Sequence, residues 1–235
     1  MKTTDRVAAL DWAAIATDLN AQGFAQTGTV LDADACRALA ALYDDDKRFR
    51  STVVMARHGF GRGEYKYFAN PLPKQVVALR RALYPRLAPI AQAWADAIGI
   101  TQPIPDRLDD FLTLCDAAGQ TRPTPLILRY GPGDYNRLHQ DLYGEVVFPI
   151  QVAIALSRPG EDFTGGEIVL TEQRPRMQSQ AHVLTPAQGE AVIFTTRYRP
   201  VPGSRGTYRV NMRHGVATVR SGQRLTLGII FHDAT

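Results

Sequence analysis

The first 120 residues place their apolar side chains mainly at the spacing of α-helices. This spacing predicts helices at residues 12–22, 33–43, 73–98 and 106–117. Asp32 stands where it can cap the second of these helices. Pro85 and Pro89 lie inside the third, which we expect to bend or break there. The glycine-punctuated, basic and aromatic stretch 57–68 predicts a loop or a hairpin.

From Pro125 onward the pattern changes to short apolar runs separated by turn residues. Strands are predicted at 125–130, 146–157, 165–170, 189–194, 208–219 and 224–232. Strands at this spacing, with no helix between them, are typical of an antiparallel sandwich or barrel. We therefore expect an α+β fold with a jelly-roll core over residues 125–233. Residues 1–120 would form a mainly helical layer that covers this core, and residues 1–235 a single domain.

The composition is ordinary for a globular protein, with an apolar share of 45%. The sequence has no apolar run of about 18 residues and no signal-peptide core, so we expect a soluble cytoplasmic protein without membrane contact. Cys36 and Cys115 fit no metal-binding spacing. This favours free thiols in a reducing compartment.

The net charge of +4 comes mainly from arginine, because only four of the 27 basic residues are lysine. Eight arginines stand between Arg174 and Arg220, where Glu190 is the single acid. Clustered arginines attract phosphate backbones and bind them bidentately. A GC-rich genome would explain the ratio of arginine to lysine equally well. The local cluster therefore leaves two interpretations open, a nucleic-acid contact or a solvated face.

A candidate metal site begins within the motif Y-G-P-G-D-Y-N-R-L-H-Q-D, residues 130–141, which contains His139 and Asp141. If this motif leads into a strand, His139 and Asp141 share one face of it, because side chains alternate between the two faces. His214 stands further on, in R-H-G-V. Two imidazoles and one carboxylate form the facial triad of non-haem Fe(II) oxygenases, which leaves three coordination positions open.

A second candidate set would bind a 2-oxo acid, which can chelate such a metal. Arg224, ten residues after His214, offers a permanently charged, forked donor for the distal carboxylate of the acid. Thr226 shares its face of a predicted strand and adds a hydroxyl, and Tyr130 is a third candidate. A turn at Ser221-Gly222 would place His214 and Arg224 on adjacent antiparallel strands.

The order His139-x-Asp141, His214, Arg224 resembles the 2-oxoglutarate/Fe(II)-dependent oxygenases, whose core is a cupin-like double-stranded β-helix. The segments F-T-G-G-E-I-V-L and G-E-A-V-I-F resemble strand motifs of the same superfamily. The resemblance implies Fe(II) and 2-oxoglutarate as cofactors and dioxygen as co-substrate. It also implies catalytic metal ligands at His139, Asp141 and His214, and a 2-oxoglutarate site at Arg224, Thr226 and Tyr130.

Within the superfamily, the motif ending in L-H-Q-D is similar to that of the AlkB-type nucleic-acid dealkylases. The chain as a whole resembles a bacterial family catalogued as oxygenases acting on damaged DNA. This resemblance is carried by F-R-S-T-V-V-M-A-R-H-G-F-G-R-G-E-Y-K-Y-F, R-P-T-P-L-I-L-R-Y-G and R-H-G-V-A-T-V-R-S-G-Q-R-L-T-L-G-I-I-F-H-D-A. It implies oxidative demethylation of alkylated nucleic acid.

Two departures keep other functions open. AlkB-type enzymes carry an asparagine where this chain has Leu128, and the ten-residue step from His214 to Arg224 resembles the prolyl-hydroxylase branch. The alternative is therefore a hydroxylase of a peptide, an amino acid or a small metabolite. A non-catalytic jelly-roll binding module is a third class, against which the complete triad with Arg224 argues.

The nucleic-acid hypothesis assigns substrate contacts to two segments. Tyr65 and Tyr67 would stack on bases while Lys66 follows the phosphates, although the same residues could be core aromatics around a solvated lysine. In the loop before the strand of His214, the phosphates would be neutralised by Arg197, Arg199 and Arg205. For a small anionic metabolite, these arginines would instead form a lid.

Overall fold

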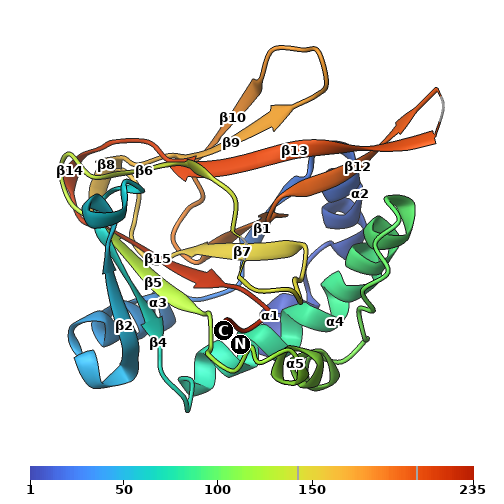
Figure 1. Ribbon diagram of the computed structural model, residues 1–235. Helices are drawn as coiled ribbons and strands as arrows, with labels where there is room; N and C mark the ends of the chain where they lie inside the picture. Colours follow the sequence, from blue (N-terminus) through green and yellow to red (C-terminus); the bar gives the residue numbers. More distant parts are fainter. Residues whose placement is uncertain (142, 205) are drawn as a thin grey trace.

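Two antiparallel sheets face each other, and helices cover the outer side of the larger sheet (Figure 1). The computed structural model describes residues 1–141, 143–204 and 206–235. The larger sheet has the order β1-β11-β7-β15-β5-β4-β2, and the smaller sheet has the order β10-β9-β13-β6-β3, with β12 paired to β13. Both termini lie close together on the helical side (Figure 1).

The strands of the larger sheet are β1 (Phe24–Thr29), β11 (Glu190–Thr195), β7 (Ile150–Ala155), β15 (Arg224–Ile229), β5 (Leu126–Tyr130), β4 (Glu64–Phe68) and β2 (Phe49–Val54). Those of the smaller sheet are β10 (Gln180–Leu184), β9 (Ile168–Gln173), β13 (Gly206–Val216), β6 (Tyr135–His139), β3 (Gly61–Arg62) and β12 (Tyr198–Gly203). A separate pair consists of β8 (Phe163–Gly165) and β14 (Val219–Gly222). The helices are α1 (Thr3–Ala8), α2 (Trp12–Gln22), α3 (Ala33–Ala41), α4 (Lys74–Ala97) and α5 (Leu108–Ala117), with short 3₁₀ turns η1 (Leu42–Asp44), η2 (Asp46–Arg48) and η3 (Met55–His58).

Strand β15 shows how the larger sheet separates the core from the interior of the sandwich. Leu225, Leu227 and Ile229 pack with the helices in the main hydrophobic core. Arg224 and Thr226 point the other way, into a cavity between the sheets. The alternation follows from the two-residue period of a strand. A single strand thus supplies both core side chains and polar side chains for a site.

Helix α4 is continuous from Lys74 to Ala97, so of the predicted bend or break at its prolines the break does not occur. Pro85 and Pro89 are four residues apart on its exposed face, where water can satisfy the carbonyls that lose a partner. The opposite face is buried in the core and holds the helix on the sheet. The helix predicted from residue 106 begins at Leu108.

The N-terminal part of the chain is less helical than its pattern indicates, because β1, β2 and β4 belong to the larger sheet. Strand β1, F-A-Q-T-G-T, lacks a β-branched apolar run, so its sequence is not typical of a strand. It lies at the edge of the sheet and is held by pairing with β11. The three segments form strands because they pair with strands of the sheet: β1 with β11, β4 with β5, and β2 with β4.

The glycine-punctuated stretch forms the tip of the β2–β4 hairpin and crosses from the larger to the smaller sheet. At this tip β3 pairs with β6, where a Cβ on Gly61 would clash with the carbonyl oxygen of Tyr135. A Cβ on Gly63 would lie 2.8 Å from a ring carbon of Tyr130. Both glycines also have positive φ, at 144° and 104°. The glycines therefore let the hairpin close one side of the sandwich.

Two further expectations concern the thiols and the membrane. Cys36 and Cys115 are both buried free thiols, as predicted. In the part of the chain that the structure describes, no helix has the length and apolar character needed to cross a membrane.

His232 makes the stability of the fold depend on pH. It is fully buried, and its Nδ1 accepts a hydrogen bond of 3.2 Å from the backbone N–H of Phe148. Burial lowers the pKa of His232 to about 4. Between this value and about 6.5 the unfolded chain binds a proton that the folded chain does not, so stability is lost as the pH falls through this window.

We expect His232→Asn to flatten this dependence, because asparagine keeps an acceptor for the Phe148 N–H but does not titrate. The wild type should lose up to about 3 kcal/mol of unfolding free energy through this group between about pH 7 and 4. Urea unfolding across that range measures the effect. Equal slopes for the two proteins would contradict it.

Candidate metal centre

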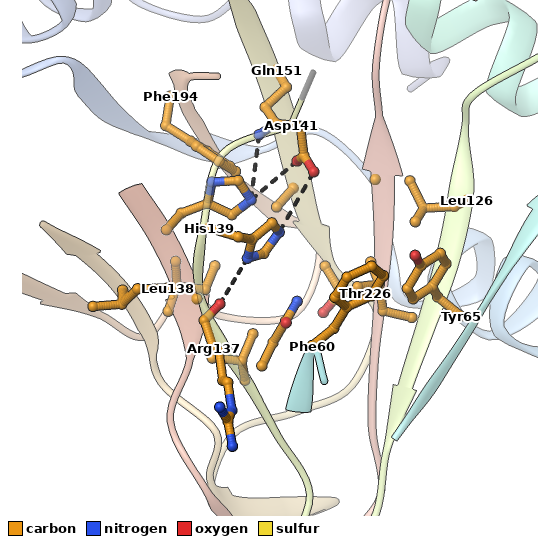
Figure 2. A pocket seen from close by; sticks show the side chains of 18 of the residues that line it. Phe60, Tyr65, Leu126, Arg137, Leu138, His139, Asp141, Gln151, Phe194 and Thr226 are labelled. Carbon is orange, nitrogen blue, oxygen red and sulfur yellow. Dashed lines mark hydrogen bonds and ion pairs between the residues drawn. The ribbon is translucent and has the colours of Figure 1, made fainter. Parts of the chain in front are cut away.

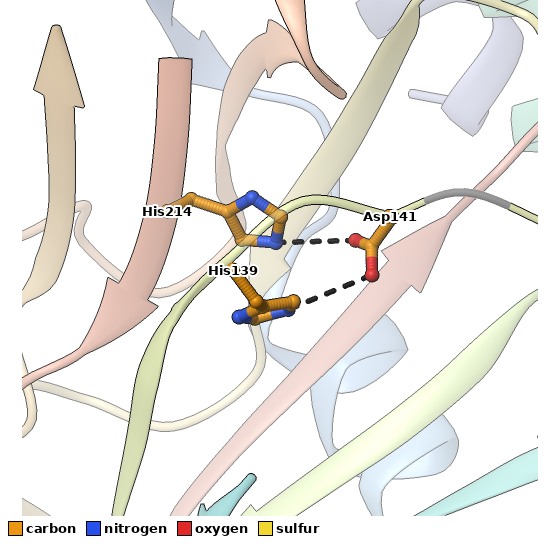
Figure 3. A group of neighbouring side chains, drawn as sticks. All are labelled: His139, Asp141 and His214. Carbon is orange, nitrogen blue, oxygen red and sulfur yellow. Dashed lines mark ion pairs between the residues drawn. The ribbon is translucent and has the colours of Figure 1, made fainter. Parts of the chain in front are cut away.

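His139, Asp141 and His214 come together between the two sheets (Figure 3). His139 is the last residue of β6 and lies directly opposite His214 on β13. Their ring centroids are 4.2 Å apart. The Asp141 carboxylate lies 3.1 Å from Nε2 of His214 and 3.5 Å from Nε2 of His139. One nitrogen or oxygen atom from each residue lies within 4.8 Å of the others.

The local geometry around Asp141 differs from the expected one. The strand ends at His139 instead of beginning there, so Asp141 lies in the following loop. Gln140 fixes this loop, because its amide donates to the carbonyls of Met212 and Arg197 at 2.9 and 3.2 Å. The anchored loop thus brings the Asp141 carboxylate to the two imidazoles. The alternation of side chains along a strand, which the sequence had suggested, does not.

The charges of the three side chains of the triad are coupled. Nδ1 of His139 lies 2.7 Å from the carbonyl oxygen of Arg137, a hydrogen bond that orients the ring with Nε2 toward the Asp141 carboxylate. Burial raises the pKa of Asp141, but the imidazoles of His214 and His139 outweigh it and hold the pKa well below its usual range. Burial and the neighbouring His139 lower the pKa of His214. Burial also lowers the pKa of His139, but the hydrogen bond and the charge of Asp141 outweigh it and raise that pKa overall. The carboxylate is therefore ionised, and a metal ion bound here would compete with a proton on His139.

Arg224, Thr226 and Tyr130 face the triad from the larger sheet. Arg224 and Thr226 lie on β15, and Tyr130 pairs with Arg224 from β5. All three are buried, and the structure gives the hydroxyls of Tyr130 and Thr226 no hydrogen-bond partner among the described residues. Nor does any carboxylate of those residues form an ion pair with Arg224. A buried cation and two unpaired hydroxyls fit the carboxylate of a bound acid.

The relation between His214 and Arg224 also differs from the expected one. They do not lie on adjacent strands, since β14 comes between them in the chain and pairs with β8. His214 belongs to the smaller sheet and Arg224 to the larger, so they face each other across the interior. Gly166 makes room for the arginine, because a Cβ there would lie 2.8 Å from its Cδ. This gives the second glycine of the segment F-T-G-G-E-I-V-L a structural role.

Both groups line one cavity of about 510 Å³. Its lining also includes Tyr65, Phe60 and Leu138, which are labelled in Figure 2. Its size lies within the range of small-molecule sites. A co-substrate held between Arg224 and the triad would leave the remaining volume of the cavity to a substrate.

Comparison with known proteins identifies the family. Residues 63–234 match a protein family described as "Oxygenase, catalysing oxidative methylation of damaged DNA". The chain belongs to this oxygenase family. Two proteins of Mycobacterium tuberculosis, from strains CDC 1551 / Oshkosh and ATCC 25618 / H37Rv, are each 50% identical to the oxygenase over 191 residues, or 80% of this chain and 82% of the relative. Both are described as uncharacterized.

Solved structures share the fold of the oxygenase at low identity. A Pseudomonas putida prolyl-4-hydroxylase is 18% identical with a TM-score of 0.54, covering 95% of this chain and 99% of that one. A Burkholderia pseudomallei oxidoreductase of the 2OG-Fe(II) oxygenase family is 19% identical with a TM-score of 0.55, covering 95% and 93%. A Trichoplax adhaerens prolyl hydroxylase, in complex with a peptide fragment of hypoxia inducible factor, is 15% identical with a TM-score of 0.56, covering 94% and 89%.

These similarities confirm the predicted double-stranded β-helix fold, and the family confirms the predicted oxygenase. Fe(II) and 2-oxoglutarate are the cofactors of this enzyme class, with dioxygen as co-substrate. The donor sets described above fit both cofactors, because two imidazoles and a carboxylate converge on one point and a buried arginine faces them.

The residues predicted to contact a substrate are scattered by the fold. Tyr65 lines the cavity, whereas Tyr67 is buried beside it. Lys66 points to the other face of β4, where its ammonium group donates to Asp46 at 2.6 Å. Neither Tyr67 nor Lys66 is exposed for a base or a phosphate.

The arginines of the β12 segment are not gathered at the cavity. Arg199 is buried and forms an ion pair with Glu172, with Nε 2.9 Å from the carboxylate. Arg197 stacks on the ring of Tyr198 at 4.4 Å. Arg205 lies outside the described residues. In these cases a buried acid or a neighbouring ring, which the linear pattern does not reveal, takes up the side chain.

Tyr143 and Gln151 line the cavity but were missed by sequence reasoning. The Tyr143 hydroxyl donates to Oδ1 of Asp141 at 2.9 Å and accepts from the Tyr67 hydroxyl at 3.1 Å. Gln151 lies 3.5 Å from Nε2 of His214. Gln151 carried a signal, since it is the polar residue within the apolar run I-Q-V-A-I-A. Tyr143 carried a weaker one, its position two residues after Asp141.

We expect Tyr143→Phe to weaken Fe(II) binding by roughly 10- to 100-fold, because partners that orient metal ligands typically contribute this much. Asp141 would keep its charge but lose the hydroxyl that orients it. Anaerobic titration with Fe(II) at saturating 2-oxoglutarate, followed by the charge-transfer absorption band, measures the affinity. Tyr208→Phe, on the distant β12–β13 hairpin, is the matched control. Equal affinities for the two variants would contradict this role of Tyr143.

Proposed function

We propose that this oxygenase hydroxylates a C–H bond of an alkylated base in nucleic acid, with the iron held by His139, Asp141 and His214. Each turnover would consume dioxygen and 2-oxoglutarate and release succinate, carbon dioxide and the hydroxylated product. On an N-methyl group, the product is an N-hydroxymethyl base, which breaks its C–N bond to give formaldehyde and the free base. The overall reaction is oxidative demethylation.

The observation that carries the proposal is the arrangement of two donor sets within one cavity. The triad approaches from the smaller sheet and its loop, while Arg224, Thr226 and Tyr130 approach from the larger sheet. A five-carbon dicarboxylic oxo acid has a chelating end and a distal carboxylate, so it matches such a pair of sites. The mouth of the cavity is left for the substrate.

The side chains have separable roles in this proposal. His139 is held in one tautomer by the Arg137 carbonyl, and Tyr143 orients the carboxylate of Asp141. Arg224, with the hydroxyls of Thr226 and Tyr130, binds the distal carboxylate of the co-substrate in a site without bulk water. When bound, Fe(II) supplies the oxidising chemistry, coupled to decarboxylation of 2-oxoglutarate. The protein supplies position and the exclusion of water.

Nucleic acid is supported as the substrate by the description of the family, which names damaged DNA. The fold alone does not choose the substrate, because prolyl hydroxylases share it. The ten-residue step from His214 to Arg224 favours a second candidate, a hydroxylase of a peptide, an amino acid or a small metabolite. A non-catalytic binding module would use the same cavity without turnover.

Succinate formation with defined substrates tests the proposal. We expect turnover with single-stranded oligonucleotides that carry N-methylated bases, formaldehyde in equal amount, and much less succinate with unmodified oligonucleotides or a proline-rich peptide. His139→Ala, Asp141→Ala and His214→Ala should each abolish turnover while the protein stays folded. Coupled turnover with the peptide alone would replace nucleic acid by the second candidate. Wild-type turnover in any of the three variants would refute the ligand assignment.

We expect Arg224→Lys to raise the KM for 2-oxoglutarate roughly 10-fold or more, and to lower kcat much less. Lysine keeps the charge but loses the fork that binds a carboxylate with two hydrogen bonds. Steady-state kinetics with varied 2-oxoglutarate measure both constants. If the KM does not change, the carboxylate is bound elsewhere in the cavity.

A further inference from the structure

An exposed aromatic side chain stands at the mouth of the cavity. Phe60, at the tip of the β2–β4 hairpin, is 48% exposed, and Leu138 on β6 is 44% exposed, yet both line the cavity. The imidazole of His58 stacks on the Phe60 ring at 5.3 Å with an interplanar angle of 24°. Among the large hydrophobic residues that are exposed in the described parts of the chain, Phe60 is the only aromatic.

The backbone that carries this aromatic pair is fixed. The N–H of Phe60 donates to the carbonyl of Met55 at 3.2 Å, and the Phe60 carbonyl accepts from the N–H of Arg137 at 2.8 Å. The side chain of Met55 is fully buried and anchors the turn. The Phe60 ring is therefore exposed to solvent on a backbone that is already ordered. A partner that covers the ring gains apolar contact without the entropic cost of ordering the loop.

Three arginines surround the aromatic pair: Arg57 at the end of η3, Arg62 on β3 and Arg137 on β6. All three are exposed, and none has a carboxylate within 4.0 Å in the part of the chain that the structure describes. The segment from residue 47 to residue 63 contains no acid. The Glu64 carboxylate is taken up by Arg129 and Tyr43. The mouth thus carries positive charge that the protein does not neutralise.

Planar stacking surfaces combined with unpaired cations are the features that bind single-stranded nucleic acid. We propose that the hairpin tip is a nucleic-acid-binding rim. Phe60 and His58 stack on bases at the mouth, while Arg57, Arg62 and Arg137 contact phosphates of the same strand. The inference rests on the proposed function and names the surface that delivers its substrate. An acidic peptide would use the charges but would gain little from the exposed rings.

The rim lies away from the arginine-rich segment around β12, which the sequence pattern had predicted to contact phosphates. Figure 1 shows the β12–β13 hairpin at the opposite end of the smaller sheet from the tip of the β2–β4 hairpin. Figure 2 shows the Arg137 side chain directed away from the triad, so its charge is available outside the cavity. The aromatic and basic residues that fit a nucleic acid are thus those three to eight residues before Tyr65, together with Arg137 on β6.

Binding of a fluorescein-labelled single-stranded 12-nucleotide DNA, measured by anisotropy at several salt concentrations, tests the rim. The triple variant Arg57→Gln, Arg62→Gln and Arg137→Gln should have a less steep fall of log affinity with log salt. The slope should be smaller in magnitude by about 2, since each phosphate contact contributes about 0.7. Phe60→Ala should weaken binding roughly 5- to 100-fold, and Phe60→Trp should retain it. Thermal melting checks that each variant is folded.

The matched control removes three other exposed arginines that lack a carboxylate partner: Arg86→Gln, Arg176→Gln and Arg209→Gln combined. These residues lie on α4, between β9 and β10, and on the β12–β13 hairpin. Its net charge changes by the same amount as that of the rim variant. Because its arginines lie outside the rim, it should keep most of the affinity and of the salt slope. Equal losses in the two triple variants would show a general charge effect and overturn the rim.

The outcomes separate the rim from the proposed function. If the wild type binds DNA and demethylates it while the Phe60 and arginine variants do so equally well, the rim is wrong and the function stands. If polyglutamate binds as tightly as DNA and Phe60→Ala weakens neither, the surface is a peptide or polyanion site and the rim is wrong. If the wild type shows neither DNA binding nor turnover with methylated DNA, the proposed function fails and the rim fails with it.

Discussion

The pairing of β6 with β13 is the constraint on which the rest of the site depends. It places His139 directly opposite His214, so that two imidazoles approach each other at the end of a strand pair. Neighbouring strands in a sheet keep a fixed separation, and this separation sets the distance between the rings. Asp141 then needs only a short anchored loop to reach both nitrogens. Because the three groups already lie together, little further ordering would oppose a metal ion bound there.

The site is built from groups that would be costly without ligands. Arg224 is buried without an acidic partner among the described residues, and two buried hydroxyls beside it lack acceptors. Each unsatisfied buried polar group costs on the order of 1–3 kcal/mol. The fold tolerates this cost because the helices bury a large apolar core on the other face of the same sheet. Stability thus comes from one face of the larger sheet and chemistry from the other.

The mouth of the cavity follows a different principle, because its features face water. Phe60 is held by backbone hydrogen bonds of the hairpin tip and stacks on His58, and the surrounding arginines have no carboxylate within 4.0 Å in the described parts of the chain. In contrast, Arg199 and Lys66 have equal charge but are taken up by acids of the protein. The availability of a charge, more than its presence in the sequence, separates a binding surface from a structural ion pair.

The sequence by itself determined the fold class, the four helices α2 to α5, six strands of the core, and the residue types of the two donor sets. These follow from local periodicity and from the chemistry that imidazole, carboxylate and guanidinium groups can perform. Only the tertiary structure decided that β1, β2 and β4 join the larger sheet, and that His214 and Arg224 face each other from different sheets. It also decided which aromatic and basic residues reach the mouth. These are non-local outcomes, because pairing partners, burial and ion pairs depend on segments distant in the chain, and a local pattern carries no record of them.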